Sequence, residues 1–190
     1  MRRVKRIILT LLLAVVILMI LKLLPQESKL PARKARKLSD GASGLVVRVV
    51  DGDTLKVRVR ATQQVATIRV LGIDCPESRK NSKCQRDGKQ GRHGCRWQIP
   101  RGKKAKQLAK HLLENETVTL ECGGKCRKGS YGRFLRYVRM KNGVDYGQEM
   151  IRKGLCEDFG WKYPHKRATT YQKVQAMAKR SHGGIWKQAL

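Results

Sequence analysis

Hydrophobic and polar residues alternate along two short segments in the first half of the chain. Residues 45–50 read LVVRVV and residues 55–60 read LKVRVR, with Leu, Val and Val of the second segment on one face. A period of two predicts half-buried β-strands, here with a cationic outer face. Asp-Gly lies between the segments and is a strong hairpin signal. The mostly apolar segment 64–74 predicts a third strand, which completes a β-meander.

The second half of the chain alternates between helical and strand-like periods. Residues 78–104 hold almost no apolar side chains and many Lys and Arg, which predicts a long basic loop. Leu and Ala then recur at helical spacing. The pattern predicts helices at 105–115, 146–154 and 166–184 and strands at 116–122 and 131–140. The order β-β-β-α-β-β-α-α is that of an OB-fold. We therefore expect an α+β, mainly β fold, a five-stranded OB-fold barrel with three helices.

The N-terminal region has a different pattern. A cationic tail, residues 1–6, precedes the apolar run 7–24, which as a helix would be about 27 Å long and would cross a bilayer. Residues 25–44 are basic and contain two prolines, which predicts a flexible linker before the domain at 45–190. A cleavable signal peptide is the alternative. No A-x-A-like site follows the run, and the run is long for a signal peptide, so we favour an uncleaved transmembrane anchor.

Six cysteines bear on the compartment of the domain. An even number in a small domain is typical of disulfides in an exported protein. Six cysteines allow 15 pairings; Cys122 and Cys126 could close a short loop, and Cys84 and Cys95 could staple the basic loop. Zinc bound by Cys84, His93 and Cys95 is the alternative. Basic residues flank both ends of the apolar run, so the count of positive charges does not settle its orientation. Mainly because of the cysteines, we expect the N-terminus inside and the domain periplasmic or extracellular.

The net charge of +29 points to a polyanionic partner, nucleic acid or an anionic membrane surface. Against this charge, the chain has only 14 acids, and several gather at two points. Asp53 begins the second predicted strand and Asp74 ends the third, so adjacent strands bring them close. Two carboxylates and a backbone carbonyl make a hard oxygen site that suits calcium. The alternative is that these acids serve a turn and a strand end, which we accept for Asp51.

Three further side chains suit phosphate chemistry. Glu77 follows Pro76, and a carboxylate held beside a metal can deprotonate a water molecule. Arg69 lies in an otherwise apolar strand, and Arg133 opens the predicted fifth strand. Two guanidinium groups can hold a phosphate and stabilise the charge that develops on it.

Three separated motifs then occur in an order that resembles the staphylococcal nuclease (thermonuclease) family. They are VVDGDTLKV, IRVLGIDCPES and SYGRFLRYV, and the later GQEMIRKGLCEDFGWKYP and AKRSHGGIWK are similar to the second and third helices and tail of that family. The resemblance covers roughly residues 45–187. It implies an OB barrel with three helices and a calcium-dependent phosphodiesterase that acts on DNA and RNA and leaves 3′-phosphates.

The resemblance also implies roles for individual residues. Asp53, Asp74 and the backbone carbonyl of Cys75 match the calcium ligands, Glu77 the general base, and Arg69 and Arg133 the phosphate-stabilising pair. Substrate contacts are implied for Tyr131, Trp161 and Tyr163. The loop after Glu77 is longer and more basic than in the familiar enzyme, and the cysteines depart from it. Because soft sulfur is a poor partner for calcium, we predict the Cys75 thiol to be buried or in a disulfide.

Two other functions fit parts of the sequence. A non-catalytic OB module would bind nucleic acid through the same basic surface without cleaving it. A membrane-surface protein would use the anchor and linker and would bind lipid. Every charged position of the three motifs is filled, so we favour the nuclease. We expect it to be a monomer that prefers single strands or frayed ends, because aromatic side chains stack on unpaired bases.

Overall fold

The computed structural model describes Met19 and residues 35–186. The chain divides into two compact units, 1–32 and 33–190, and only the second is described below. The predicted tail and anchor, apart from Met19, and the first part of the predicted linker lie outside the described residues. Within the described residues, no helix has the length and apolar character needed to cross a membrane.

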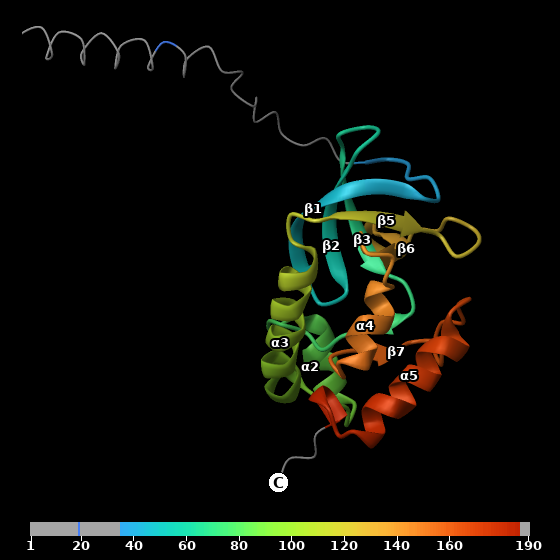
Figure 1. Cartoon of the computed structure of the whole chain (residues 1–190). Coiled ribbons are helices and arrows are strands. Elements are labelled where there is room, and N and C mark those ends of the chain that lie inside the picture. The colour runs from blue at the N-terminus through green and yellow to red at the C-terminus, as the bar shows by residue number, and fades with distance from the viewer. Residues whose placement is uncertain (1–18, 20–34, 187–190) are drawn as a thin grey trace, which may run out of the picture. The chain divides into compact units, whose positions relative to one another are not determined.

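Five strands close into a barrel in the order β1-β2-β3-β6-β5, as the sequence pattern predicts (Figure 1). Strands β3 and β6 pair in parallel, and the other neighbours are antiparallel. Alternate side chains such as Val46, Leu55 and Ile68 are fully buried in the barrel core. The strands are β1 (Ala42–Asp51), β2 (Thr54–Val59), β3 (Val65–Val70), β5 (Thr117–Glu121) and β6 (Phe134–Arg139).

The third predicted strand breaks at Gly72 into two pieces. Gly72 has a φ of +83°, and a Cβ there would lie 2.6 Å from the His165 ring, so this turn requires glycine. After the turn, β4 (Ile73–Asp74) leaves the barrel and pairs with β7 (Glu157–Asp158) in a separate two-stranded sheet. The break places Asp74 at the end of the barrel, next to the β1–β2 turn.

The described residues contain four α-helices, so the prediction of three helices is wrong by one. The predicted basic loop 78–104 contains α2 and the first turns of α3, which begins ten residues earlier than expected. Asn81 caps α2 by accepting a hydrogen bond from the backbone of Cys84. These turns are exposed and basic, so they carry no apolar stripe. The helices are α2 (Ser82–Lys89), α3 (Cys95–Leu113), α4 (Tyr146–Arg152) and α5 (Ala168–Arg180).

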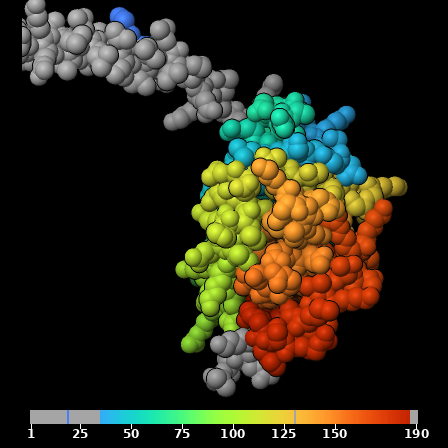
Figure 2. All heavy atoms as spheres, viewed as in Figure 1, coloured from blue at the N-terminus to red at the C-terminus, as the bar shows by residue number. Residues whose placement is uncertain are grey.

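The helices lie at one end of the barrel. Helix α3 packs on β1, while α4 contacts both β6 and α5. On the face seen in Figure 2, the atoms of α3, α4 and α5 form a continuous surface below the strands. Two short 3₁₀ turns, η1 (Ser130–Gly132) and η2 (Gly184–Trp186), complete the described elements.

The end of the predicted linker packs on the barrel. Ala35 and Leu38 are buried, and the backbone N–H of Ala35 donates to the carbonyl of Val65 at 3.1 Å. The fully buried guanidinium of Arg136 donates to the carbonyl of Leu38. Strand β1 already begins at Ala42, so the packed domain extends N-terminally beyond the expected boundary at residue 45.

Three disulfides use all six cysteines. Cys84 pairs with Cys95, and Cys122 pairs with Cys126. Both pairings were considered in the sequence analysis and are confirmed. The zinc alternative is therefore wrong, because both of its cysteines are oxidised. Cys75 pairs with Cys156 across a sequence separation of 81, which confirms that the Cys75 thiol is in a disulfide.

Candidate active site

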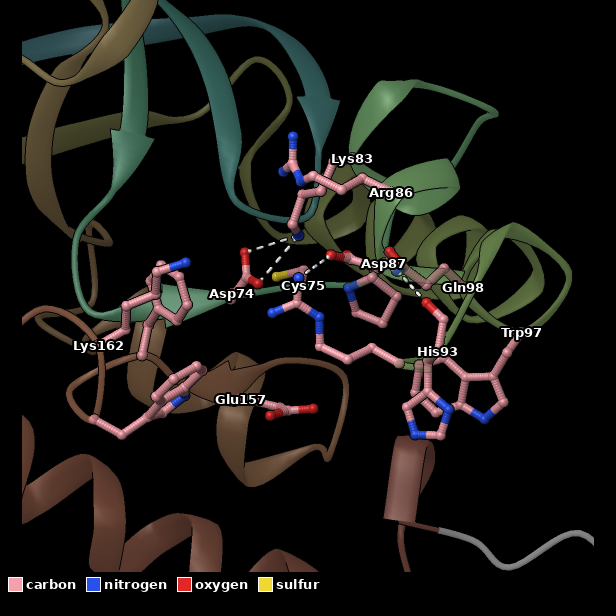
Figure 3. Close-up of a pocket in the computed structure, with 14 residues that line it drawn as sticks. Asp74, Cys75, Lys83, Arg86, Asp87, His93, Trp97, Gln98, Glu157 and Lys162 are labelled. Atoms are coloured by element: carbon pink, nitrogen blue, oxygen red, sulfur yellow. Dashed lines mark hydrogen bonds and ion pairs between the residues drawn. The ribbon is translucent and has the colours of Figure 1, made fainter. Parts of the chain in front are cut away.

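One large cavity at the helix-bearing end of the barrel gathers most of the predicted site residues. Its volume is about 1120 Å³. A smaller cavity of about 230 Å³ adjoins it and shares Asp74 and Phe159 with it. Cys75 and Trp161 line the smaller cavity (Figure 3). The predicted residues that line the larger cavity are Asp53, Arg69, Asp74, Glu77, Tyr131, Arg133 and Tyr163.

Asp53 and Asp74 converge on the guanidinium of Arg69. Nη2 of Arg69 lies 2.8 Å from Oδ1 of Asp74 and 3.3 Å from Oδ2 of Asp53. The guanidinium is oriented from its other side, because Nη1 donates to the carbonyl of Ile73 at 2.7 Å. Burial raises the pKa of Asp74, although Arg69 and Lys83 oppose that change. The two acids and the arginine thus form one partly buried cluster, as the sequence predicts.

Lys83 is a member of this cluster that sequence reasoning missed. Its Nζ lies 3.1 Å from Oδ2 of Asp74 and 3.2 Å from Oε1 of Glu77, and the contacts to Asp74 are drawn in Figure 3. Burial opposes the charge of Lys83, but Asp74 and Glu77 outweigh it and raise its pKa. In the sequence Lys83 is one basic residue among many. Only the first turn of α2, fixed by the Asn81 cap, directs it to the acids.

The segment that carries Glu77 is held on three sides. Asn81 Nδ2 donates to Oε2 of Glu77 at 2.5 Å, and the Glu77 backbone N–H donates to Oε1 of Gln98 at 3.2 Å. Gly102 of α3 packs directly against this segment. A Cβ at that position would lie 2.4 Å from the Glu77 backbone, so the close approach requires glycine. Asp51, expected to serve only the turn, accepts from the backbone of Ser78 at 3.2 Å. Its pKa is raised by burial.

The donor set around Asp53 and Asp74 suits calcium. Asp53 Oδ1 accepts from Thr54 Oγ1 at 2.9 Å, and Oδ2 accepts from the Cys75 N–H at 3.1 Å. Because its sulfur is in a disulfide, Cys75 would offer a metal its backbone carbonyl and not its thiolate. Two carboxylates and a carbonyl are the hard oxygen donors that calcium prefers, and they already attract cationic side chains. Among the described residues, no three His, Cys, Asp or Glu side chains form a ready metal group.

Aromatic and basic side chains also line the two cavities. Tyr131 has a left-handed backbone, φ 62°, and its ring is 90% exposed. The guanidinium of Arg133 lies 5.8 Å from that ring. Tyr163 and Trp161 are exposed and both pack edge-on against Phe159. Both rings are therefore open to a substrate, Tyr163 beside the large cavity and Trp161 beside the small one.

A family model described as "Staphylococcal nuclease homologue" matches residues 67–188, which is more than half of the chain. This chain belongs to the staphylococcal nuclease homologue family. The family match includes Arg69, Asp74, Glu77 and Arg133, and it ends beyond α5. The five-stranded closed barrel is consistent with the family, which supports the predicted enzyme class, a nuclease-type hydrolase.

Individual relatives of this staphylococcal nuclease homologue agree with that class. The chain is 32% identical to endonuclease YhcR of Bacillus subtilis, over 88% of this chain but only 13% of that protein. It is 30% identical to thermonuclease of Staphylococcus hyicus, over 74% of this chain and 73% of that protein. It is 29% identical to an uncharacterised endonuclease of Escherichia coli, over 77% of this chain and 78% of that protein.

Proposed function

We propose that this protein is a calcium-dependent endonuclease that hydrolyses DNA and RNA and leaves 3′-phosphates. The observation that carries the proposal is that Asp53, Arg69, Asp74 and Glu77 converge in one cavity, which Arg133 also lines. The relatives named thermonuclease and endonuclease support it.

The substrate strand is attracted by charge and held by side chains that line the two cavities. The net charge of +29 on the chain draws a polyanion and makes binding strongly dependent on salt. Arg133 and Tyr131, which line the large cavity, contact the strand, the guanidinium at a phosphate and the ring at a base. Trp161 and Tyr163 offer further stacking surfaces, which favours single strands.

Asp53, Asp74 and the backbone carbonyl of Cys75 would hold calcium, which would supply positive charge next to the phosphate. Glu77 takes a proton from a water molecule, and the water oxygen forms a bond to phosphorus. The bond between phosphorus and the 5′-oxygen breaks, and that oxygen takes a proton from solvent, which leaves a 3′-phosphate. Arg69 and Arg133 neutralise the charge that develops on the phosphate oxygens. Asn81 orients the Glu77 carboxylate through its 2.5 Å hydrogen bond.

The location of the domain is also a proposal. Residues 7–24 anchor the chain in a membrane with the N-terminus inside, and the nuclease domain acts as a monomer in the periplasm or outside the cell. Three disulfides support an oxidising compartment.

The test uses the full chain in detergent and a labelled single-stranded DNA. We expect cleavage with calcium, none with EGTA, and 3′-phosphate ends. Glu77→Gln should lower the rate about 10²- to 10⁴-fold while binding persists. Glu116→Gln, an exposed acid outside both cavities, is the matched control and should keep the rate. Unchanged cleavage by Glu77→Gln would refute the assignment, and binding without any cleavage would favour the non-catalytic OB module.

A further inference from the structure

The small cavity beside the acid cluster contributes Asp74, Cys75 and the stacking ring of Trp161 to the proposed function, but its α2–α3 side has no role there. It shares Asp74, Lys83, Arg86 and Phe159 with the large cavity, so the two are contiguous. In Figure 3 it lies between Lys83 and Asp74 on one side and the ring pair of His93 and Trp97 on the other. Its volume, about 230 Å³, is below the roughly 300 to 1,000 Å³ of sites for drug-sized ligands. The cavity therefore suits part of a nucleotide and not a whole cofactor.

The wall of this cavity is a fixed structure, although the sequence predicts a loop there. The Cys84–Cys95 disulfide ties α2 to the start of α3. Asp87 of α2 pairs with Arg92 at 3.0 Å and accepts from the buried side chain of Gln98 at 3.1 Å. Because these contacts hold both helices and the turn between them, binding here would order little further chain.

Aromatic rings stand at both ends of the cavity. His93 stacks on Trp97 with 3.8 Å between ring centres, and Arg101 covers the Trp97 ring at 4.3 Å. Both contacts hold the Trp97 ring in place, and His93 is exposed. At the other end Trp161 is 70% exposed and is braced by Phe159, with 5.8 Å between ring centres. Such braced, open rings are the stacking platforms that proteins offer to unpaired bases.

The charged residues that line the cavity favour different positions for the base and the phosphate of a nucleotide. Glu157 lies inside it and would repel a phosphate there. Of the basic residues that line the cavity, Arg86 and Lys162 form no ion pair with a carboxylate of residues 35–186, and Arg86 lines both cavities. A backbone phosphate therefore has its favourable position beside Arg86, where the two cavities meet, with the attached base in the small cavity.

We propose that the α2–α3 corner forms an additional subsite for one nucleotide next to the scissile phosphate, with Arg86 on its phosphate and Trp161 against its base. The inference rests on the proposed function, because it extends the strand path from the reaction centre. It also gives the basic residues 78–104 a role. Helix α2 extends the surface that binds the substrate strand beyond the acids, instead of serving only as a solvated surface.

Binding in a cleavage-deficient background tests this subsite. The full chain with Glu77→Gln is titrated with fluorescent single-stranded DNA in EDTA at several salt concentrations. With Arg86→Gln added, we expect the slope of log affinity against log salt to fall by about 0.7, the value of one phosphate contact on a single strand. With Trp161→Ala added, affinity should fall at least about fivefold, in the range of one stacked base. A strand with one abasic nucleotide should lose less affinity on Trp161→Ala than an intact strand.

Arg96→Gln is the matched control, because Arg96 is an exposed arginine of the same basic segment, residues 78–104, and lines neither cavity. It should keep both slope and affinity. Equal effects of Arg86→Gln and Arg96→Gln would overturn the subsite and leave a diffuse basic surface. Unchanged affinity in Trp161→Ala would overturn its stacking role. These outcomes are read without cleavage, so failure of the proposed nuclease activity would be seen separately in the calcium assay.

Discussion

The Cys75–Cys156 disulfide should stabilise the domain more than either of the other two. In the chain-entropy description, a cross-link stabilises by shrinking the unfolded ensemble, and its effect grows with the length of the closed loop. For the separation of 81 this gives about 4.5 kcal/mol at 25 °C. The separation of 11 for Cys84–Cys95 gives about 2.8 kcal/mol, and the separation of 4 for Cys122–Cys126 about 1.9 kcal/mol.

Equilibrium unfolding in urea checks this order. We compare the full chain with the double variants Cys75→Ala/Cys156→Ala and Cys84→Ala/Cys95→Ala, following tryptophan fluorescence. The first variant should lose about 1.7 kcal/mol more than the second, from the difference in loop length. The gap should widen further, because Cys75 and Cys156 are both buried and their truncation leaves a cavity.

An ordinary domain has a free energy of unfolding of about 5–15 kcal/mol, so loss of the Cys75–Cys156 cross-link would remove a large part of it. If the first variant does not fold at 25 °C while the second does, that result shows the same order. Equal losses for the two variants, or a larger loss for Cys84→Ala/Cys95→Ala, would refute the reasoning from loop length.

Three further predictions concern single residues. Gly102→Ala should displace the Glu77 segment and lower cleavage at least about tenfold, since its Cβ would lie 2.4 Å from that backbone; Gly183→Ala, where the nearest atom is 3.5 Å away, should not. Arg139 and Arg167 lower the pKa of Glu121 below its ordinary 4.5, so Glu121 stabilises the fold above that pH and loses the effect as pH falls. The melting temperature of Glu121→Gln should therefore be lower than that of the unsubstituted protein at pH 7, and the difference should shrink as the pH falls below 4.5. Arg136→Met should leave the Leu38 carbonyl without its donor, destabilise the domain by about 1–3 kcal/mol, and speed hydrogen exchange at residues 35–40; the Arg127 carbonyl keeps its bond from the Leu135 backbone.

Alternating patterns in the sequence determined the barrel. Segment 55–60 buries every second side chain, so its period identifies it as a strand, whereas segment 45–50 buries Val46 and Val49 across a register shift in β1. The acids at the turn and at the strand end could be paired in advance for the same reason: a hairpin brings Asp53 beside the following strand. Sequence reasoning therefore placed Asp53, Arg69 and Asp74 together before their distances were known.

The helix α2 was beyond sequence reasoning. Residues 78–104 have no apolar period, because the turns of α2 face solvent and are held by a cap and a disulfide instead of a core. Lys83 and Gly102 were missed with it. Neither carries a signal of its own, since one is a lysine in a basic segment and the other a glycine within a helix.

Composition and local pattern thus determined the barrel, the basic surface, the acid cluster and the presence of disulfides. Only the tertiary structure decided which cysteines pair, that Lys83 bridges Asp74 and Glu77, and that a second cavity adjoins the first. The physical reason is the range of the forces involved. Strand periodicity and hairpin turns depend on residues that are neighbours in the sequence. Cys75 contacts Cys156, and Glu77 contacts Gly102, only after distant segments have packed together.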